Sequence, residues 1–388
     1  MTELEDSLTF AILSLPTHGP GARVLASAIG GPLALARAIA HSPAWHHVAP
    51  VTIVVRERPE PLLGVIGRFD ASTRARLATL TWQLERVLPR LLVLDQPAVE
   101  RAVEALAVNL VERFGRAALH RHRFEAVPRG GLVVLGLLAY VLDLDPTHLE
   151  VRQDDRRPRI VIDDCALSGV RFRQHLAALP EHASVVFAPL VATPELRAAV
   201  ERDPRVRACV SGLDLRDAAQ ALYGAEYERW RERWSKRQAT LGYWVGQPPH
   251  VCFPWNEPDI AVWNEERGVS ERALPLLPPE RCLKHRALGR RQMARVVVQP
   301  APHRQLRLAD DLVFGEFEGA LVLSRPSWST PLVLNGVASA LWNALLSHGE
   351  TSAAATEVAQ TYGAEPARVA GDFDGFVRAL RERGAIAA

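Results

Sequence analysis

The sequence predicts an α/β protein in which helices cover both faces of a mostly parallel β-sheet, joined to a small α+β domain. Strand and helix patterns alternate between residues 123 and 210. One strand pattern ends in two adjacent acids, and residues 312–386 contain a hairpin pattern followed by three helical patterns. Alternation is typical of parallel sheets, whereas a hairpin followed by helices indicates a separate module.

The α/β part is predicted to begin with an amphipathic helix over residues 96–115, whose apolar residues recur at helical spacing. Strand patterns follow at 123–127, 148–151, 159–162, 184–190 and 206–210. Helical patterns lie at 132–142, 170–179 and 194–202, and a charged helix is expected at 223–236. The apolar strands lack alternation, which is typical of strands buried on both faces.

Four segments are expected in this chain of 388 residues. They are an N-terminal region at 1–96, the α/β domain at 97–258, a Pro-rich linker at 259–290 and the C-terminal domain at 291–388. The first segment has helix patterns near 26–40 and 72–87 and a strand pattern at 51–55. It carries no motif, so covering the site and forming a homodimer both stay open as its role.

Composition argues against several classes of protein. The net charge of +2 gives no electrostatic case for a nucleic-acid partner. No apolar run approaches the roughly 20 residues that span a membrane, and the acidic start lacks the basic region of a signal peptide. The four cysteines form no Cys-x-x-Cys pair, so neither zinc nor a disulfide framework is indicated. We therefore expect a cytoplasmic protein.

The most informative stretch is Ile-Val-Ile-Asp-Asp-Cys-Ala-Leu-Ser-Gly at 160–169. Ligands of open α/β sheets collect at the carboxyl ends of strands, which is where Asp163 and Asp164 stand. The turn at Ser168 and Gly169 can direct backbone N–H groups at a phosphate. The pattern predicts a ribose-phosphate site; the alternative is a solvated acid pair that caps the next helix.

This stretch resembles the ribose-diphosphate-binding motif of type I phosphoribosyltransferases. Phe-Glu-Ala-Val-Pro-Arg-Gly-Gly-Leu at 124–132 looks like the pyrophosphate loop of the same family, closest to its xanthine/guanine branch. His-Val-Cys-Phe-Pro-Trp at 250–255 is similar to the segment that closes the base pocket in that branch. The three pieces occur in the family's order over about 130 residues, roughly one domain.

The resemblance implies a role for each matching residue. Arg129, Gly130 and Gly131 would bind diphosphate, and Ser168 and Gly169 the 5′-phosphate. Asp163 and Asp164, as catalytic and metal-binding residues, would hold the ribose hydroxyls and a hydrated Mg²⁺. The reaction implied is displacement of pyrophosphate from phosphoribosyl diphosphate at the anomeric carbon.

The base pocket and the phosphate turn are less regular. His250 would stack on a base and Val251 would supply backbone contacts; equally, this segment could be the core and rim of a lid. Leu167 replaces an acid that the purine branch usually carries, which argues against a nucleobase salvage phosphoribosyltransferase. Arg171 stands where small residues are usual, so it either adds a bidentate phosphate contact or fills the site.

The C-terminal patterns predict strands at 312–318 and 320–323 joined at Gly319, and then three helices. Asn335 is expected to cap the first helix, the second spans 352–362, and the third begins at Pro366. This order resembles a small winged-helix domain. The Leu-Asn-x-x-Ala-x-x-Leu-Trp pattern from 334 resembles the PqqD family, the peptide-recognition elements of ribosomal peptide maturation, over about 291–386.

In that family a precursor's leader peptide adds as a strand to the hairpin and packs against the last helix. The resemblance therefore implies that Val322, Leu323, Phe376 and Arg378 bind peptide. Together the two resemblances predict a tailoring protein that transfers a phosphoribosyl group to a precursor peptide. A non-catalytic adaptor, which senses a nucleotide and presents the peptide to partner maturation enzymes, is the alternative.

Overall fold

The computed structural model divides the chain into two compact units, one of residues 90–259 and 282–284 and the other of residues 1–89, 260–281 and 285–388. It describes residues 9–15, 30–41, 51–57, 62–66, 90–149, 157–238, 242–256, 261–264, 269–272, 277, 279–286, 294–317, 320–325, 327–334 and 336–386. No helix in these ranges is long and apolar enough to cross a membrane.

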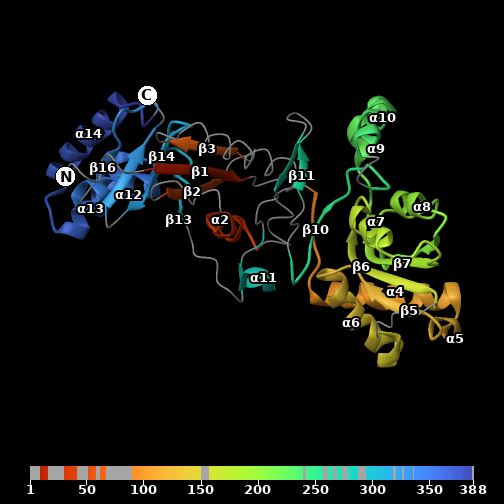
Figure 1. The fold of residues 1–388 in the computed structure, drawn as a ribbon. Helices are drawn as coiled ribbons and strands as arrows, with labels where there is room; N and C mark the ends of the chain where they lie inside the picture. The colour runs from red at the N-terminus through yellow and green to blue at the C-terminus, as the bar shows by residue number, and fades with distance from the viewer. Residues whose placement is uncertain are drawn as a thin grey trace. The chain divides into compact units, whose positions relative to one another are not determined.

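The first unit contains a five-stranded parallel sheet (Figure 1), which confirms the predicted parallel α/β arrangement. The strand order is β5-β6-β7-β8, and the short β9 pairs with β7. The strands are β5 (Arg123–Ala126), β6 (Arg159–Ala166), β7 (Val185–Ala192), β8 (Val206–Cys209) and β9 (Leu213–Asp214). Every residue of β7 is buried, as expected of a strand covered on both faces.

Helices cover both faces of this sheet. The helices are α4 (Gln96–Phe114), α6 (Gly130–Leu142), α7 (Val170–Ala177) and α8 (Pro194–Val200). Apolar residues of α4 and α6 share one core with Ile160 and Ile162 of β6. Those of α7 and α8 share another core with Val161. Because neighbouring strand residues point to opposite faces, the two helix pairs lie on opposite sides, as Figure 1 also shows.

The start of the strand expected at 148–151 is wrong. Residues Pro146–His148 form a 3-10 turn, in which Asp145 Oδ1 accepts a hydrogen bond from the Thr147 N–H at 2.8 Å. Residues 150–156 lie outside the described part of the chain. The apolar pattern was short, and the Asp-Pro pair that precedes it initiates a turn instead.

Several further elements complete this unit. They are β4 (Leu91–Val93), α5 (Arg116–Leu119), α9 (Ala219–Tyr223), a 3-10 turn (Gly224–Glu226), α10 (Tyr227–Gln238) and β10 (His250–Cys252). The charged helix predicted at 223–236 is thus mainly α10. β10 pairs in parallel with β4 as a separate two-stranded ladder.

The second unit contains a four-stranded sheet in the order β13-β2-β1-β3, in which only β3 runs antiparallel. Its elements are β1 (Thr9–Leu15), α2 (Pro32–Ala40), β2 (Val51–Glu57), β3 (Leu62–Ile66) and β13 (Ala294–Val298). The chain therefore returns to its N-terminal sheet after the α/β unit. The helix predicted at 72–87 lies outside the described residues.

The stretch between residue 259 and residue 290, predicted as a linker, also contains ordered elements. β11 (Ala261–Asn264) pairs antiparallel with β12 (Val269–Arg272). A 3-10 turn (Pro279–Arg281) and α11 (Leu283–Arg286) follow.

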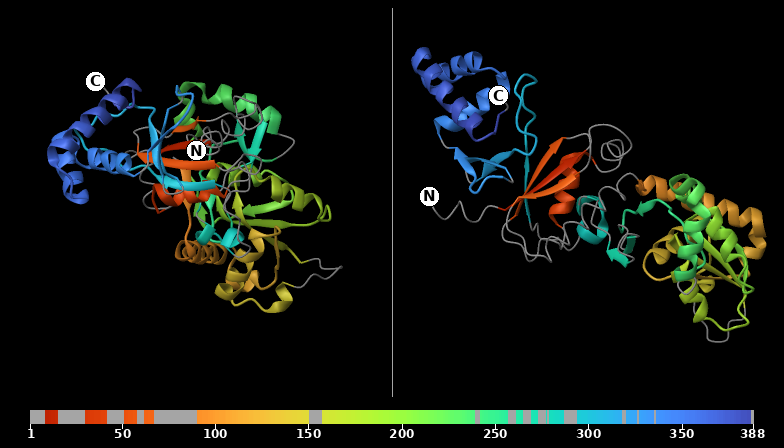
Figure 2. Two further views of the ribbon diagram at one scale, coloured as in Figure 1. Left: turned by 90° about the vertical axis from the view of Figure 1, so that its left-hand side faces the viewer. Right: turned by 90° about the horizontal axis from the view of Figure 1, so that it is seen from above.

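The C-terminal part has the predicted hairpin and three helices, together with a third strand. Its elements are β14 (Val313–Phe317), β15 (Ala320–Ser324), β16 (Leu332–Leu334), α12 (Val337–His348), α13 (Thr351–Tyr362) and α14 (Pro366–Glu382). The antiparallel strand order is β14-β15-β16, and the helices, blue in Figure 2, gather beside these strands. Trp342 is fully buried in the core between them, and its ring meets that of Phe314 edge-on at 5.1 Å.

The start of α12 differs in detail from the prediction. Gly336 stands at the N-cap position with φ 52°, and no side chain caps the helix. Asn335, the predicted cap, lies outside the described residues.

Candidate functional site

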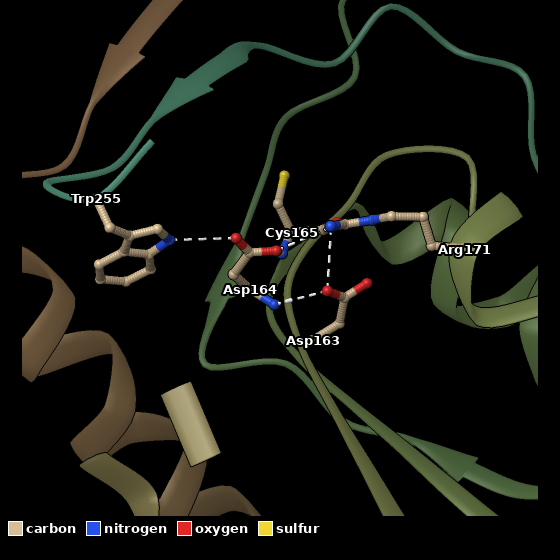
Figure 3. A network of polar contacts seen from close by, with 5 residues as sticks. All are labelled: Asp163, Asp164, Cys165, Arg171 and Trp255. Carbon is tan, nitrogen blue, oxygen red and sulfur yellow. Dashed lines mark hydrogen bonds and ion pairs between the residues drawn. The ribbon is translucent and has the colours of Figure 1, made fainter. Parts of the chain in front are cut away.

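The carboxylates of Asp163 and Asp164 stand side by side near the carboxyl end of β6 (Figure 3). Their residues are 1% and 5% exposed. Asp163 Oδ1 accepts the Asp164 N–H, and Asp164 Oδ1 accepts the Cys165 N–H, each at 2.9 Å. The pair is therefore a buried polar feature of the sheet edge and not a solvated helix cap.

Arg171, in the first turn of α7, bridges the two carboxylates. Its Nη2 lies 3.0 Å from Asp163 Oδ1 and 2.8 Å from Asp164 Oδ1. The same nitrogen donates to the Cys165 carbonyl oxygen at 2.8 Å. Nε and Nη1 of Arg171 have no hydrogen-bond partner among the described residues, and the side chain is 34% exposed. Nη2 is therefore anchored to the acid pair, whereas the N–H donors of Nε and Nη1 can still bind a ligand.

Trp255 closes the network from a distant part of the chain. Its indole Nε1–H donates to Asp164 Oδ2 at 3.3 Å (Figure 3), and its ring stacks on Phe253 at 4.9 Å. The motif at 250–255 contains Trp255, but the sequence predicts His250 as its functional residue. A tryptophan after proline, in a segment expected to close the site, was a signal that could have pointed to Trp255.

The first turn of α6 approaches the carboxylates so closely that only glycine fits at Gly130 and Gly131. A Cβ at Gly130 would overlap the Asp164 carboxylate, and one at Gly131 would lie 2.7 Å from the Ile162 carbonyl oxygen. Arg129, just before them, adopts φ 76°, which is rare for a residue with a side chain. The structure thus brings the predicted loop 129–131 against the acid pair.

The turn at Ser168 and Gly169 leads directly into α7, and Gly169 has φ 75°. No side chain caps α7. The Ser168 carbonyl oxygen accepts the Tyr243 N–H at 2.8 Å. The Tyr243 ring lies so near Gly169 that a Cβ there would come within 2.9 Å of it. The segment that reaches Asp164 through Trp255 therefore also packs on this turn.

His250 and Val251 lie in β10, and among the described residues neither forms a hydrogen bond or an ion pair with the acid pair. His250 Nε2 lies 3.4 Å from Nη2 of Arg90, and Val251 is buried in the core of the unit. Burial, with a smaller contribution from Arg90, lowers the pKa of His250 to about 3, so its imidazole is neutral at physiological pH. A neutral ring can still stack, and its predicted role on a base stays a prediction.

Burial also changes the acid–base behaviour of the network. It raises the pKa of Asp163 well above the usual value; Arg171 opposes this shift and Asp164 adds to it. For Cys165, burial and then the two carboxylates raise the pKa of the thiol well above its ordinary value. Burial lowers the pKa of Arg171, but the two carboxylates outweigh it and raise the pKa overall. Cys165 is accordingly a neutral thiol and not a poised nucleophile.

The arrangement does not fit the Mg²⁺ that the resemblance implies. Both Oδ1 atoms face Arg171, and Asp164 Oδ2 accepts the Trp255 N–H. Asp163 Oδ2 alone of the four oxygens has no partner among the described residues. Within the same residues, no group of three or more His, Cys, Asp or Glu gathers that could hold a metal ion. Chemically, the network can accept hydroxyl donors at its oxygens and offer guanidinium N–H groups to an anion.

The four predicted peptide-binding residues of the C-terminal domain lie on two elements, two on β15 and two on α14. β15 is the central strand: Val322 pairs with Gly315 and Val333, and Leu323 pairs on both sides as well. An added strand cannot pair with Val322 or Leu323, which corrects that expectation. On α14, Phe376 is half-buried against the core and Arg378 is exposed.

Comparison with known proteins assigns the C-terminal part. Residues 321–386 match the family model of coenzyme PQQ synthesis protein D, PqqD. This part of the chain is a PqqD domain. A solved structure, TbiB1 in complex with the TbiA(beta) leader peptide, is 23% identical to this chain. The match covers 21% of this chain and 93% of that one, with a TM-score of 0.19. No curated protein matches the chain.

The match includes β15, β16 and all three helices of the PqqD domain, and it ends at Ile386. Leu308, which precedes β14, forms an isolated antiparallel bridge with Ile386. The last residue of the match therefore pairs with the segment that precedes β14.

Proposed function

We propose that this protein tailors ribosomally made peptides: its PqqD domain binds the leader peptide of a precursor, and its α/β unit binds phosphoribosyl diphosphate. The observation that carries the proposal is the PqqD domain at 321–386. It shares a chain with a buried acid–guanidinium network at the carboxyl edge of a parallel sheet, the edge at which such sheets bind ligands.

The leader peptide is expected to add to β16. The Phe314 N–H donates to Gln299 Oε1 at 3.3 Å, so this residue's backbone points away from β15. In an antiparallel sheet the direction alternates along each strand. Leu323 lies opposite Phe314 on one side and opposite Leu332 on the other. Because Phe314 faces away from β15, Leu323 faces β16, and Leu332 faces back toward β15. The next residue, Val333, therefore directs its backbone N–H and C=O away from β15. Val333 is thus the residue of β16 to which a peptide strand can pair.

The end of α14 lies beside the approach to this strand. Trp328, shortly before β16, donates its indole N–H to the Arg383 carbonyl oxygen at 2.9 Å. In this proposal Phe376 and Arg378 of the same helix supply an apolar and a cationic contact to the peptide. A peptide held in this way combines main-chain pairing with side-chain selection.

The α/β unit supplies the groups that a sugar diphosphate needs. The carboxylates can accept ribose hydroxyls, Arg171 can donate to a phosphate, and the uncapped first turn of α7 follows the Ser168–Gly169 turn. In the proposed reaction a nucleophile of the peptide bonds to the anomeric carbon while the bond from that carbon to pyrophosphate breaks. Pyrophosphate leaves with the electron pair, and the nucleophile's proton passes to solvent.

One observation favours the adaptor alternative. Arg171 already satisfies both carboxylates from within the chain, so the α/β unit could hold a nucleotide without transferring its sugar. In that case the PqqD domain would present the peptide to a partner maturation enzyme. Both functions require the leader peptide to bind to the PqqD domain.

The test begins with a display library of peptides, from which those that bind the full chain are selected. In each library peptide the binding segment is followed by a segment of varied sequence that can serve as the acceptor. The selected peptide is incubated with phosphoribosyl diphosphate and examined by mass spectrometry. We expect the peptide to gain the mass of one phosphoribosyl group in place of a proton, and pyrophosphate to be released. Asp164→Asn should abolish this gain while peptide binding persists, and Asp143→Asn, at an exposed position, should not.

Peptide binding without any mass gain would support the adaptor instead. A chain that selects no peptide would contradict both functions.

A further inference from the structure

We propose that the guanidinium of Arg171 takes the place of a divalent cation between Asp163 and Asp164, so that the α/β unit binds its phosphorylated ligand without metal. The inference rests on the proposed sugar-diphosphate site and specifies how that site is charged. It departs from what the resemblance to phosphoribosyltransferases implies, which is a hydrated Mg²⁺ at the same two carboxylates.

The geometry places a positive charge where a shared cation would sit. A single nitrogen, Nη2, lies 3.0 Å from Asp163 Oδ1 and 2.8 Å from Asp164 Oδ1, and it also reaches the Cys165 carbonyl oxygen (Figure 3). These are three oxygen atoms of consecutive residues on one strand. Their common partner is a side chain of this chain, held by the helix that follows the strand.

A divalent ion would compete with this arrangement. Mg²⁺ demands near-octahedral oxygen ligands at about 2.0–2.1 Å, and a guanidinium on the same oxygens would repel it at short range. The indole N–H of Trp255 already lies on Asp164 Oδ2. Binding the metal would require Arg171 to leave two buried carboxylates and the Cys165 carbonyl oxygen.

The free end of Arg171 identifies the ligand chemistry. A guanidinium has five N–H donors, of which two belong to Nη2. The remaining three, on Nε and Nη1, have no partner among the described residues, and the side chain is partly exposed. Each of these donors can reach a phosphate oxygen, and the anchored Nη2 restricts the orientation of the guanidinium before the ligand arrives. Asp163 and Asp164 then act as positioning residues for Arg171 as well as acceptors for hydroxyls.

The first experiment needs no variant. Phosphoribosyl diphosphate is titrated calorimetrically into the full chain, once in EDTA and once with Mg²⁺. We expect the two dissociation constants to agree within about threefold. Binding that requires Mg²⁺ would overturn this inference and leave the proposed function standing. Absence of binding in both buffers would overturn the sugar-diphosphate site itself, and this inference with it.

A variant tests the residue. Arg171→Met should weaken binding in EDTA by about tenfold or more, and Mg²⁺ should restore part of it because the carboxylates then need a cation. Arg207→Met is the matched control, since Arg207 is exposed on β8. Near-ultraviolet circular dichroism establishes whether each variant is folded. A folded Arg171→Met protein that binds as wild type in EDTA would contradict the role of Arg171.

Discussion

The acid pair of the α/β unit and the outer edge of the PqqD sheet are both polar, but they differ in how their groups are satisfied. In the first, side-chain and backbone groups of five residues of the same chain meet within one buried network. In the second, the register and the alternation of the sheet direct the backbone of Val333 away from β15, the strand with which β16 pairs among the described residues. The comparison separates a network whose polar groups are satisfied within the chain from a strand edge whose backbone groups need a partner strand to complete their hydrogen bonds.

The largest effect is expected where the network is most tightly packed. Gly130→Ala would push a Cβ into the Asp164 carboxylate, so the free energy of unfolding should fall by about 3 kcal/mol or more. Urea denaturation followed by tryptophan fluorescence measures it. Gly136→Ala, in the same helix but with open space around its position, should instead be stabilising by about 0.5–1 kcal/mol. Equal effects at the two positions would refute the close approach.

The pH dependence of stability tests the burial of Asp163. Its pKa is higher in the folded than in the unfolded chain, so the folded state binds more protons as pH rises above the unfolded value. Stability should therefore fall with rising pH, with a slope of at most about 1.4 kcal/mol per pH unit, until the folded carboxyl has ionised. Asp163→Asn should remove this fall, which denaturation at a series of pH values from about 4 upward would show. An unchanged slope in the variant would mean that another group causes it.

The open edge is tested by a change confined to one backbone N–H. Val333→Pro should weaken leader-peptide binding by about tenfold or more, because proline cannot donate to an added strand. The domain itself should stay folded, since proline is tolerated where the N–H faces away from the sheet. Fluorescence anisotropy of a labelled peptide provides the affinity. Val333→Thr keeps the N–H and the β-branch, so wild-type affinity is expected; a loss as large as that of proline would exclude strand addition here.

The smallest effect, at Trp328, is found by comparing one indole hydrogen bond from each region. Trp255→Phe removes the donor to the Asp164 carboxylate but keeps a ring to stack on Phe253, and it should cost about 1.5–3 kcal/mol at most. Trp328→Phe removes a bond to a neutral carbonyl at a more exposed position and should cost less, about 0.5–1 kcal/mol. Thermal unfolding of both variants gives the difference. A larger loss at Trp328 would reverse the ranking of the two regions.

Sequence reasoning was most accurate where a pattern is local. Five elements lie within a few residues of their predicted bounds: the strand that carries Asp163, the helix after Gly169 and the three C-terminal helices. It failed at His148 and Leu149, where Asp145 and Pro146 form a turn that a short apolar run cannot override. β16 was not predicted either, because three residues after a turn carry too little periodicity to indicate a strand.

The candidate site was only partly predictable for a related reason. The acid pair, the glycines and Arg171 were all recognised, but the two outcomes for Arg171 could not be separated. Whether it faces a ligand or the carboxylates depends on the direction of one side chain at the start of α7. Trp255 was within a recognised motif, yet its contact with Asp164 joins residues 91 positions apart.

The sequence by itself determined the parallel α/β class, the place of the acid pair at a strand end and the PqqD pattern, because periodicity and turn chemistry act between near neighbours. Only the tertiary structure decided that Arg171 spans both carboxylates, that β13 returns to the N-terminal sheet, and that Val333 lies at an open edge. Ion pairs and strand order depend on which distant segments meet. Packing of the whole chain selects those meetings, and no local pattern encodes them.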